Sequence, residues 1–231
     1  RNPEDEFHVS DLGKVFSSKS FWTVAILCVL YYSAIFPFQR YGANMLQCNI
    51  GNMSAQEAAN IFRWFPIGAA IVTPFLGSYL DHKGKGATML IWGALLLIVC
   101  HLIFAFALPA THNKGLAYGT IVILGISFAL VPAALWPSVP KIVPEKNLGT
   151  AYSLIYWIQN MGMLLVPIFV GRIFKNMVTE AGNPVQEASA AVHAEYIFIG
   201  LGIVAIIVAL LLKDSSKKHP ELELDLPNVK K

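Results

Sequence analysis

One face of the apolar segment at residues 149–173 carries hydrogen-bonding side chains. This face holds Tyr152, Tyr156, Gln159, Asn160 and Met163. Their spacings of four, three, one and three residues place them on the same side of a helix. Hydroxyl and amide groups gathered in this way suit a wet cavity that binds polar solutes. The alternative is hydrogen bonding between helices, which small polar side chains also provide in membranes.

A full charge, that of Arg63, lies well inside another apolar segment. Arg63 is roughly 12 Å along a helix from Ser54, at ~1.5 Å per residue, and Ser54 with Glu57 forms a capping box that marks the helix start. A buried guanidinium needs an anionic partner, and its donors form a fork that fits a planar carboxylate. We predict that Arg63 contacts a substrate carboxylate or an acidic group elsewhere in the protein. The alternative is that it reaches the outer lipid headgroups.

Aromatic residues in two other segments are further candidates for the cavity wall. Tyr31 and Tyr32 belong to the first apolar segment, where a core or lipid-facing position is an equal alternative. Trp136 lies among three prolines at residues 132–140, which bend or break the helix there. Besides lining the cavity, Trp136 fits an interfacial anchor or a part of an inner gate.

No arrangement typical of an enzyme or a metal site is found in the sequence. His101 lies inside the third apolar segment, and packing or hydrogen bonding is favoured for it over proton transfer. We predict no Asp or Glu in the interior of any membrane span, so proton coupling has little support. No nucleophile–base pair suited to intramembrane catalysis is present, and the three cysteines show neither zinc spacing nor a disulfide framework. The sequence thus predicts a protein that is not an enzyme and uses no metal or cofactor.

The composition indicates a membrane protein. Of 231 residues, 55% are hydrophobic and 13% are charged, whereas soluble domains have about 25% charged residues. Six apolar segments span residues 21–46, 55–80, 87–109, 115–139, 149–173 and 191–213. Each reaches the ~20 residues that cross a bilayer core, and prolines inside them are tolerated in membrane helices. We predict an all-α membrane protein with six transmembrane helices, in place of the alternative, a large soluble helical protein.

Charge asymmetry gives the orientation. Most of the 17 Lys and Arg residues lie in residues 1–20, 81–86 and 140–148 and in the tail after residue 212. Because cytoplasmic loops are enriched in these residues, both termini are predicted to be cytoplasmic. The net charge of +3 reflects this asymmetry, so no nucleic acid is expected as a partner.

The domain organisation follows from the same pattern. Residues 1–20 form a cytoplasmic linker, residues 21–213 a six-helix transmembrane domain and residues 214–231 a cytoplasmic tail. Spans one to three and four to six are expected to form an inverted repeat of three plus three helices, as in many secondary transporters. Asn52 begins an N-glycosylation sequon on the predicted outer side, which matters only in a eukaryote. The polar start without an initiator Met indicates a piece of a longer protein.

The turn from Gly77 to Lys85 resembles a loop signature of the major facilitator superfamily, G-x-L-x-D-[RK]-x-G-[RK]-[RK]. The gating motif consists of Gly77, Asp81, Gly84 and Lys85. This chain departs from the signature at Tyr79, His82 and Gly86. In the family this loop joins the second and third spans of each six-span half, and the resemblance implies that Asp81 latches one conformation. It also implies tight packing at Gly77 and the turn itself at Gly84.

The stretch from Ala134 to Asn160 is similar to the C-terminal half of the lysosomal dipeptide uniporters of this superfamily and their bacterial relatives. The similarity implies a twelve-span transporter that works by alternating access, with an N-terminal six-span half as the partner of this half. It implies small polar solutes, dipeptides first, and a bacterial inner membrane or a lysosomal membrane. In eukaryotes it implies an accessory membrane glycoprotein. An anion or sugar carrier and a non-transporting solute sensor are the alternatives.

Overall fold

Six long helical spans build the part of the chain that the structure describes. The computed structural model describes residues 13, 15–51, 53–218 and 225–227. The spans are α2 (Lys19–Ile50); α3 (Ala55–Phe62) with α4 (Trp64–Lys83); α5 (Gly86–Leu102) with the π-helix η2 (Ile103–Ala107) and α6 (Leu108–Thr111); α7 (Lys114–Leu135) with the 3₁₀ turn η3 (Trp136–Ser138) and α8 (Val139–Ile142); η4 (Glu145–Asn147) with α9 (Leu148–Met177); and α10 (Pro184–Lys218). All six are long and apolar enough to cross a membrane, which confirms the predicted all-α fold and the number of spans.

Prolines explain where these spans change geometry. Pro66 has no N–H for the carbonyl of Phe62, the residue four positions earlier, and the helix breaks between α3 and α4 at Arg63. Pro109 likewise removes the donor for Ala105, and the segment before it is the π-helix η2. The predicted bend after residue 132 is also present, because α7 gives way to η3 and α8 there.

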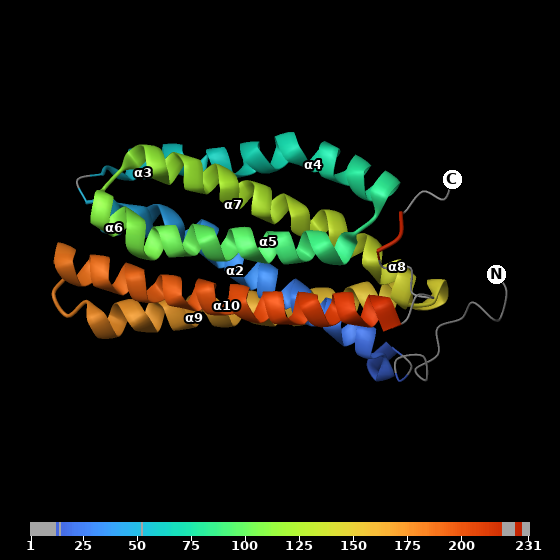
Figure 1. Ribbon diagram of the computed structural model, residues 1–231. Coiled ribbons are helices and arrows are strands. Elements are labelled where there is room, and N and C mark those ends of the chain that lie inside the picture. The colour runs from blue at the N-terminus through green and yellow to red at the C-terminus, as the bar shows by residue number, and fades with distance from the viewer. Residues whose placement is uncertain (1–12, 14, 52, 219–224, 228–231) are drawn as a thin grey trace.

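The helices pack in two groups. One group joins α7 to α4 and α5, and the other joins α2 to α9 and α10; α5 and α10 connect the two groups. Figure 1 shows these groups one above the other. The first group holds the second, third and fourth spans and the other holds the first, fifth and sixth, so neither matches the predicted units of spans one to three and four to six. If the chain is an inverted repeat, its two units interlock instead of packing separately, and that repeat stays a prediction.

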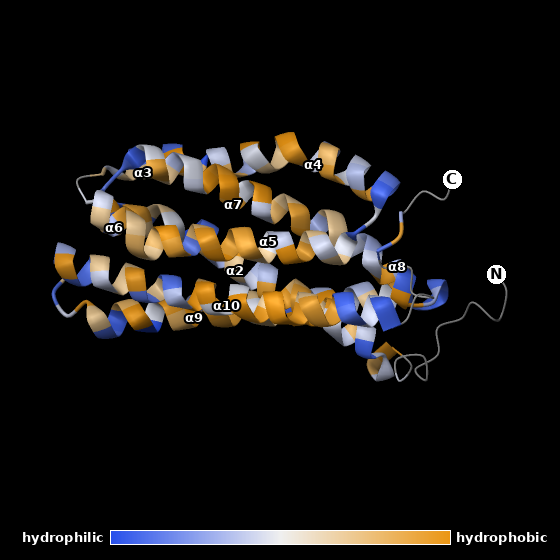
Figure 2. Ribbon diagram, viewed as in Figure 1, coloured by the Kyte–Doolittle hydropathy of each residue, from blue (hydrophilic) through white to orange (hydrophobic). Residues whose placement is uncertain are grey.

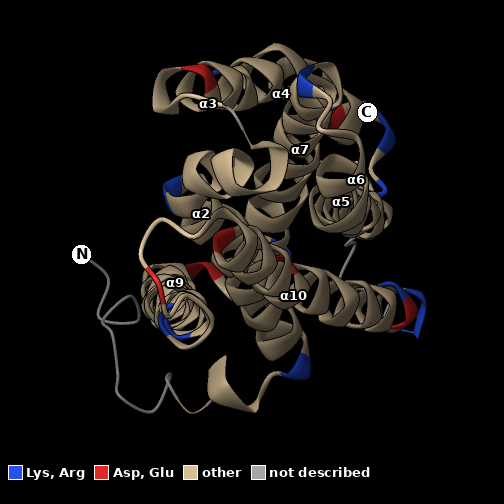
Figure 3. Cartoon of the chain, turned by 90° about the vertical axis from the view of Figure 1, so that its left-hand side faces the viewer, with Lys and Arg blue, Asp and Glu red and all other residues tan. Residues whose placement is uncertain are grey.

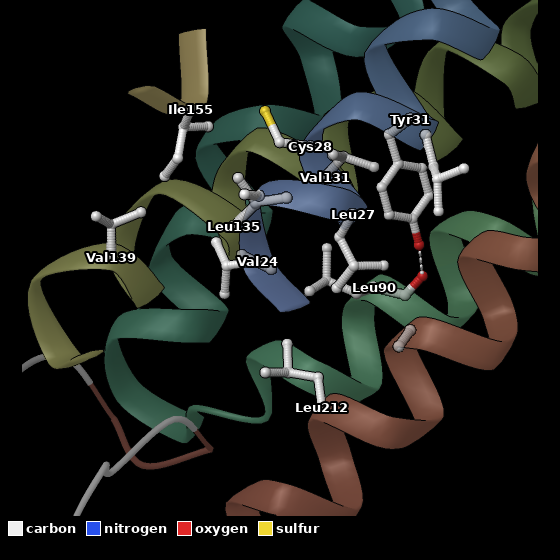
Figure 4. Packing of buried hydrophobic residues seen from close by; sticks show 14 of the residues in the cluster. Val24, Leu27, Cys28, Tyr31, Leu90, Val131, Leu135, Val139, Ile155 and Leu212 are labelled. Atoms are coloured by element: carbon white, nitrogen blue, oxygen red, sulfur yellow. Dashed lines mark hydrogen bonds between the residues drawn. The ribbon is translucent and has the colours of Figure 1, made fainter. Parts of the chain in front are cut away.

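Large apolar side chains fill the space between the helices. In the half that contains α8, Val24, Leu27 and Cys28 of α2 meet Leu135 of α7 and Leu212 of α10 in one buried cluster (Figure 4). A second cluster fills the other half around Phe38 and Phe104. Apolar surface removed from lipid gains little, so close packing is what holds such helices together.

Two helices, α4 and α9, keep most of their surface exposed. In the most apolar stretch of α2, 67% of the residues are buried, against 17% for α3 with α4 and 22% for α9. Hydrophobic residues run along the middle of the helices and hydrophilic residues collect at the ends (Figure 2). The exposed apolar faces of α4 and α9 are therefore surfaces for lipid or for protein beyond this chain.

The positions of the helix ends bear on the orientation of the chain in the membrane. The start of α2, the α4–α5 turn, α8 and the end of α10 lie at one end (Figure 1). Charged residues lie mostly near helix ends and in connections (Figure 3). This arrangement agrees with both termini on one side of the membrane; which side is cytoplasmic stays a prediction from the Lys and Arg pattern.

Glu195 corrects one prediction about charge. The predicted apolar segment 191–213 places Glu195 near the start of its span. In the structure α10 begins at Pro184, so Glu195 lies about 16 Å along the helix. Its side chain is fully buried, and Oε2 is 2.6 Å from Nδ1 of His101. The prediction of no carboxylate inside a span was therefore wrong. The expectation that His101 is a packed, hydrogen-bonded residue agrees with this contact.

Aromatic rings enclose this pair. The His101 ring stacks on Phe198, with centroids 5.0 Å apart, and Phe38 meets its edge at 4.8 Å. Among the described residues, His101 Nε2 and Glu195 Oε1 have no hydrogen-bond partner. The pair is thus a polar link between α5 and α10 inside an apolar shell.

Gly162 allows α9 to approach α2 closely. A Cβ at Gly162 would lie 2.2 Å from Ser33 Oγ and 2.7 Å from Val29 Cγ1. Gly162→Ala is expected to destabilise the bundle by about 1–3 kcal/mol, the usual cost of overpacking. The control is Gly171→Ala in the same helix, where a Cβ meets nothing within 4 Å. Thermal unfolding in detergent measures both, and equal midpoints for the two variants would contradict close α2–α9 packing.

Candidate solute-binding site

An aromatic cluster forms where α2, η3 and α9 meet. It consists of Tyr32 on α2, Trp136 in η3, and Tyr152 and Tyr156 one helical turn apart on α9. The prolines around Trp136 turn the end of α7 into η3 and α8. The structure thus brings together four of the residues that the sequence assigns to the cavity wall.

Trp136 is the centre of this aromatic cluster. Its indole Nε1 donates to the hydroxyl of Tyr32 at 2.9 Å, and its ring stacks on Tyr156 with centroids 4.9 Å apart. The Tyr152 hydroxyl donates to the Trp136 carbonyl at 3.4 Å. These contacts fix the indole, and the half-exposed ring of Tyr156 offers an aromatic face with polar groups beside it.

An open hollow connects the aromatic cluster to the gating motif. The hollow has a volume of about 460 Å³, and its lining includes Trp136 and Tyr152 from the cluster together with Gly77 and Asp81 from the end of α4. Its volume lies within the range of small-molecule sites. The rest of the wall is formed by Thr73 and Leu80 of α4, Pro132 and Ala133 of α7, Pro137 of η3 and Pro140 of α8. A polar solute held here would touch aromatic rings and a carboxylate together.

The polar face of α9 is split between two environments. Gln159 is buried, and the thiol of Cys28 on α2 donates to its Oε1 at 3.0 Å. Asn160 is exposed, and its Nδ2 donates to the carbonyl of Tyr156 at 2.7 Å. The two alternatives for this face, contact between helices and lining of a cavity, thus apply to different residues. Gln159 contacts α2, whereas Tyr156 and Asn160 lie on the open side.

Tyr31 and Arg63 lie apart from the aromatic cluster. Tyr31 is fully buried, and its hydroxyl donates to the carbonyl of Leu90 on α5 (Figure 4). Arg63 is exposed at the α3–α4 break. Counted from the α4–α5 end at ~1.5 Å per residue, Arg63 lies at about 30 Å and Tyr156 at about 12 Å. One dipeptide cannot bridge that separation, so Arg63 and the cluster are separate candidate contacts.

The gating motif is placed at the end of α4. Asp81 lies in the last turn of α4 and is half-buried, while Gly84 and Lys85 form the turn itself with φ values of 71° and 67°. A positive φ favours glycine, which explains Gly84. At Gly77 an added Cβ would meet no atom of the described chain within 4 Å. Tight packing at Gly77 is therefore an expectation for contacts with protein beyond these helices.

The structure adds aromatic residues that the sequence did not single out. Phe36 stacks on Tyr32 with centroids 5.4 Å apart, and Phe128 of α7 meets both rings edge-on. Phe36 follows Tyr32 by one helical turn, a spacing that predicts contact. Phe128 carries no comparable signal because its partners lie on another helix.

Two further expectations concern glycosylation and metal binding. Asn52, the predicted glycosylation site, lies outside the described residues. Among the residues that the structure describes, no group of three His, Cys, Asp or Glu side chains could hold a metal ion.

The six apolar spans among the described residues, with an open hollow between α4, α7, α8 and α9, fit a multi-pass integral membrane protein of the transporter class. The chain belongs to the Major Facilitator Superfamily, whose family model matches residues 32–227. This is a family of transporters and not of enzymes.

The chain is similar to several named members of the superfamily. The chain is 34% identical over 152 residues to the human "Lysosomal dipeptide transporter MFSD1", covering 66% of this chain and 31% of the relative. The zebrafish protein of the same name is 35% identical over 156 residues, covering 68% and 32%. The Escherichia coli "Inner membrane transport protein YdiN" is 27% identical over 112 residues, covering 48% and 25%. The chain spans about a third of the length of the lysosomal relatives.

Proposed function

We propose that this chain is the C-terminal half of a twelve-span facilitator that carries small polar solutes, dipeptides first, by alternating access. The observation that carries the proposal is the aromatic cluster at Trp136, which opens into the hollow lined by Asp81. Aromatic faces with fixed hydroxyl and amide groups suit a short peptide, which has apolar and hydrogen-bonding parts. The names of the lysosomal relatives support dipeptides as the first class to test.

The exposed faces of α4 and α9 support the partner assignment. Both helices border the open side of the site, and both leave most of their apolar residues uncovered. In the proposal, the N-terminal six-span half covers these faces and supplies the opposite wall of the cavity. Asp81, at the mouth of the hollow, then lies where the two halves separate and close.

Uptake into proteoliposomes tests the proposal. The intact transporter that contains this chain is reconstituted, and entry of labelled dipeptides is compared with entry of labelled sugars and organic anions. Saturable dipeptide uptake, competed by other dipeptides and unaffected by the sugars, is the expected result. Uptake of a sugar or anion alone would redirect the substrate assignment. Ligand-induced thermal stabilisation without any uptake would favour a solute sensor.

Asp81→Asn is expected to lower this uptake several-fold while leaving membrane insertion unchanged. Asparagine keeps the shape of the side chain but removes the charge with which the carboxylate latches a conformation. Asp214→Asn is the matched control, because Asp214 pairs with Lys218 on the exposed end of α10. Rates are normalised to the amount of inserted protein, and a wild-type rate for Asp81→Asn would contradict the gating role.

A further inference from the structure

Residues 225–227 have a defined seat on the α4–α5 turn. The N–H of Lys85 donates to the Asp225 carbonyl at 2.8 Å, and the N–H of Ala87 donates to Asp225 Oδ1 at 3.0 Å. Lys141 Nζ donates to the carbonyl of Leu226 at 3.0 Å. Donors from the turn, from α5 and from α8 thus converge on two residues that follow α10.

Asp225 caps α5 from a distant part of the chain. The first N–H groups of a helix have no intrahelical acceptor, and Lys85, the residue at the N-cap position, makes no side-chain cap. Aspartate is one of the preferred capping residues, and its charge favours a helix N-terminus. Here the acceptor comes from 138 residues along the chain.

Gly84 is shaped for the same contact. A Cβ at Gly84 would lie 2.2 Å from the Asp225 carbonyl oxygen and 2.6 Å from the carbonyl carbon of Leu226. These are backbone atoms, so they cannot move aside as the end of a flexible side chain can. The glycine of the gating motif therefore serves two purposes, since it forms the turn and leaves room for residues 225–227.

Leu226 lies behind the wall of the candidate site. It borders a small hollow together with Leu80, Ala133 and Pro137. The same three wall residues line the 460 Å³ hollow on its other side. One layer of side chains thus separates residues 225–227 from the space where the solute is proposed to bind.

We propose that residues 225–227 form a brace that holds the α4–α5 turn of the gating motif against α8. In this brace Asp225 caps α5, and Leu226 supports the wall formed by Leu80, Ala133 and Pro137. When the brace is seated, the α4–α5 turn and α8 are held together. Its release lets this wall shift and slows transport. The seat rests on contacts within this chain, whereas the effect on rate rests on the proposed function.

Hydrogen exchange tests the contact between residues 225–227 and the α4–α5 turn without any substrate. In the intact transporter, Asp225→Ala removes the side-chain acceptor of Ala87, and exchange of that amide is expected to speed by roughly five- to tenfold, the loss typical of a helix cap. The Lys85 amide donates to the backbone carbonyl of residue 225, so its exchange speeds as well when the segment leaves its seat. Asp225→Asn is expected to leave exchange near wild type, because asparagine caps as well as aspartate. Asp214→Ala removes a carboxylate from exposed α10 and should change neither amide.

Uptake in the same variants tests the brace. Asp225→Ala is expected to lower uptake at least threefold at an unchanged unfolding midpoint, and Asp225→Asn to restore it. Unchanged exchange in Asp225→Ala would overturn the seat, whether or not uptake changes. Faster exchange with wild-type uptake would overturn the brace. If no solute is transported by the wild type, the proposed function fails, and the exchange result alone decides the seat.

Discussion

Glu195→Ala is expected to lower the free energy of unfolding by about 3–5 kcal/mol, the cost of breaking a buried pair from one side. The variant leaves the buried His101 without its hydrogen-bond partner, between Phe38 and Phe198. It also opens a cavity between α5 and α10. Unfolding in mixed detergent micelles with increasing SDS measures the change.

Two further variants separate the contribution of the His101–Glu195 pair from that of the residues around it. Asp214→Ala removes an exposed carboxylate of the same helix, and a surface pair of this kind contributes at most about 1 kcal/mol. The double variant His101→Phe with Glu195→Leu should recover most of the loss, because apolar replacement of a buried pair is often neutral. Equal destabilisation by Glu195→Ala and Asp214→Ala would show that the pair does not hold α5 to α10.

Trp136→Ala is expected to reduce the transport rate at low solute concentration about tenfold or more. It removes the indole face at the hollow and also frees the rings of Tyr156 and Tyr32, which the indole holds in place. An aromatic contact with the solute is worth roughly 0.5–1.5 kcal/mol, and about 1.4 kcal/mol is a factor of ten in rate. Initial uptake of a labelled dipeptide at concentrations far below saturation measures the effect.

Trp92→Ala is the matched control for Trp136→Ala. Trp92 lies on α5 with its ring mostly exposed, outside the aromatic cluster, so its loss should leave uptake unchanged. Trp136→Phe keeps an aromatic face but loses the donor to Tyr32, and an intermediate rate is expected. Full activity of Trp136→Ala would remove the cluster from the binding site.

The six spans could be predicted from the sequence because length and hydropathy alone decide whether a helix crosses a bilayer. Their packing could not. Helices such as α5 and α7 are apolar on all sides, so no stripe marks the face that meets a neighbour. The interlocked grouping of α2 with α9 and α10 therefore had no local signal. Glu195 was missed for a related reason, since α10 begins seven residues before the predicted apolar segment.

The candidate site was predictable in part. Helical spacing places Tyr152, Tyr156, Gln159 and Asn160 on one face of α9, and the structure agrees with that periodicity. Spacing cannot tell which edge of the face meets α2. In the structure Gln159 accepts a hydrogen bond from Cys28 and so belongs to the α2–α9 interface. Arg63 shows a second limit, because depth along one helix does not reveal distance from residues on another.

The interlocked packing has a consequence for synthesis in the cell. α2 is the most buried of these spans and is made before its neighbours α9 and α10. At ~5–20 residues per second, the chain from α2 to the end of α9 takes roughly ten seconds or more to appear. During that interval Cys28 lacks its partner Gln159 on α9, so a ribosome that stops before α9 leaves the α9-facing side of α2 uncovered and open to quality-control proteases.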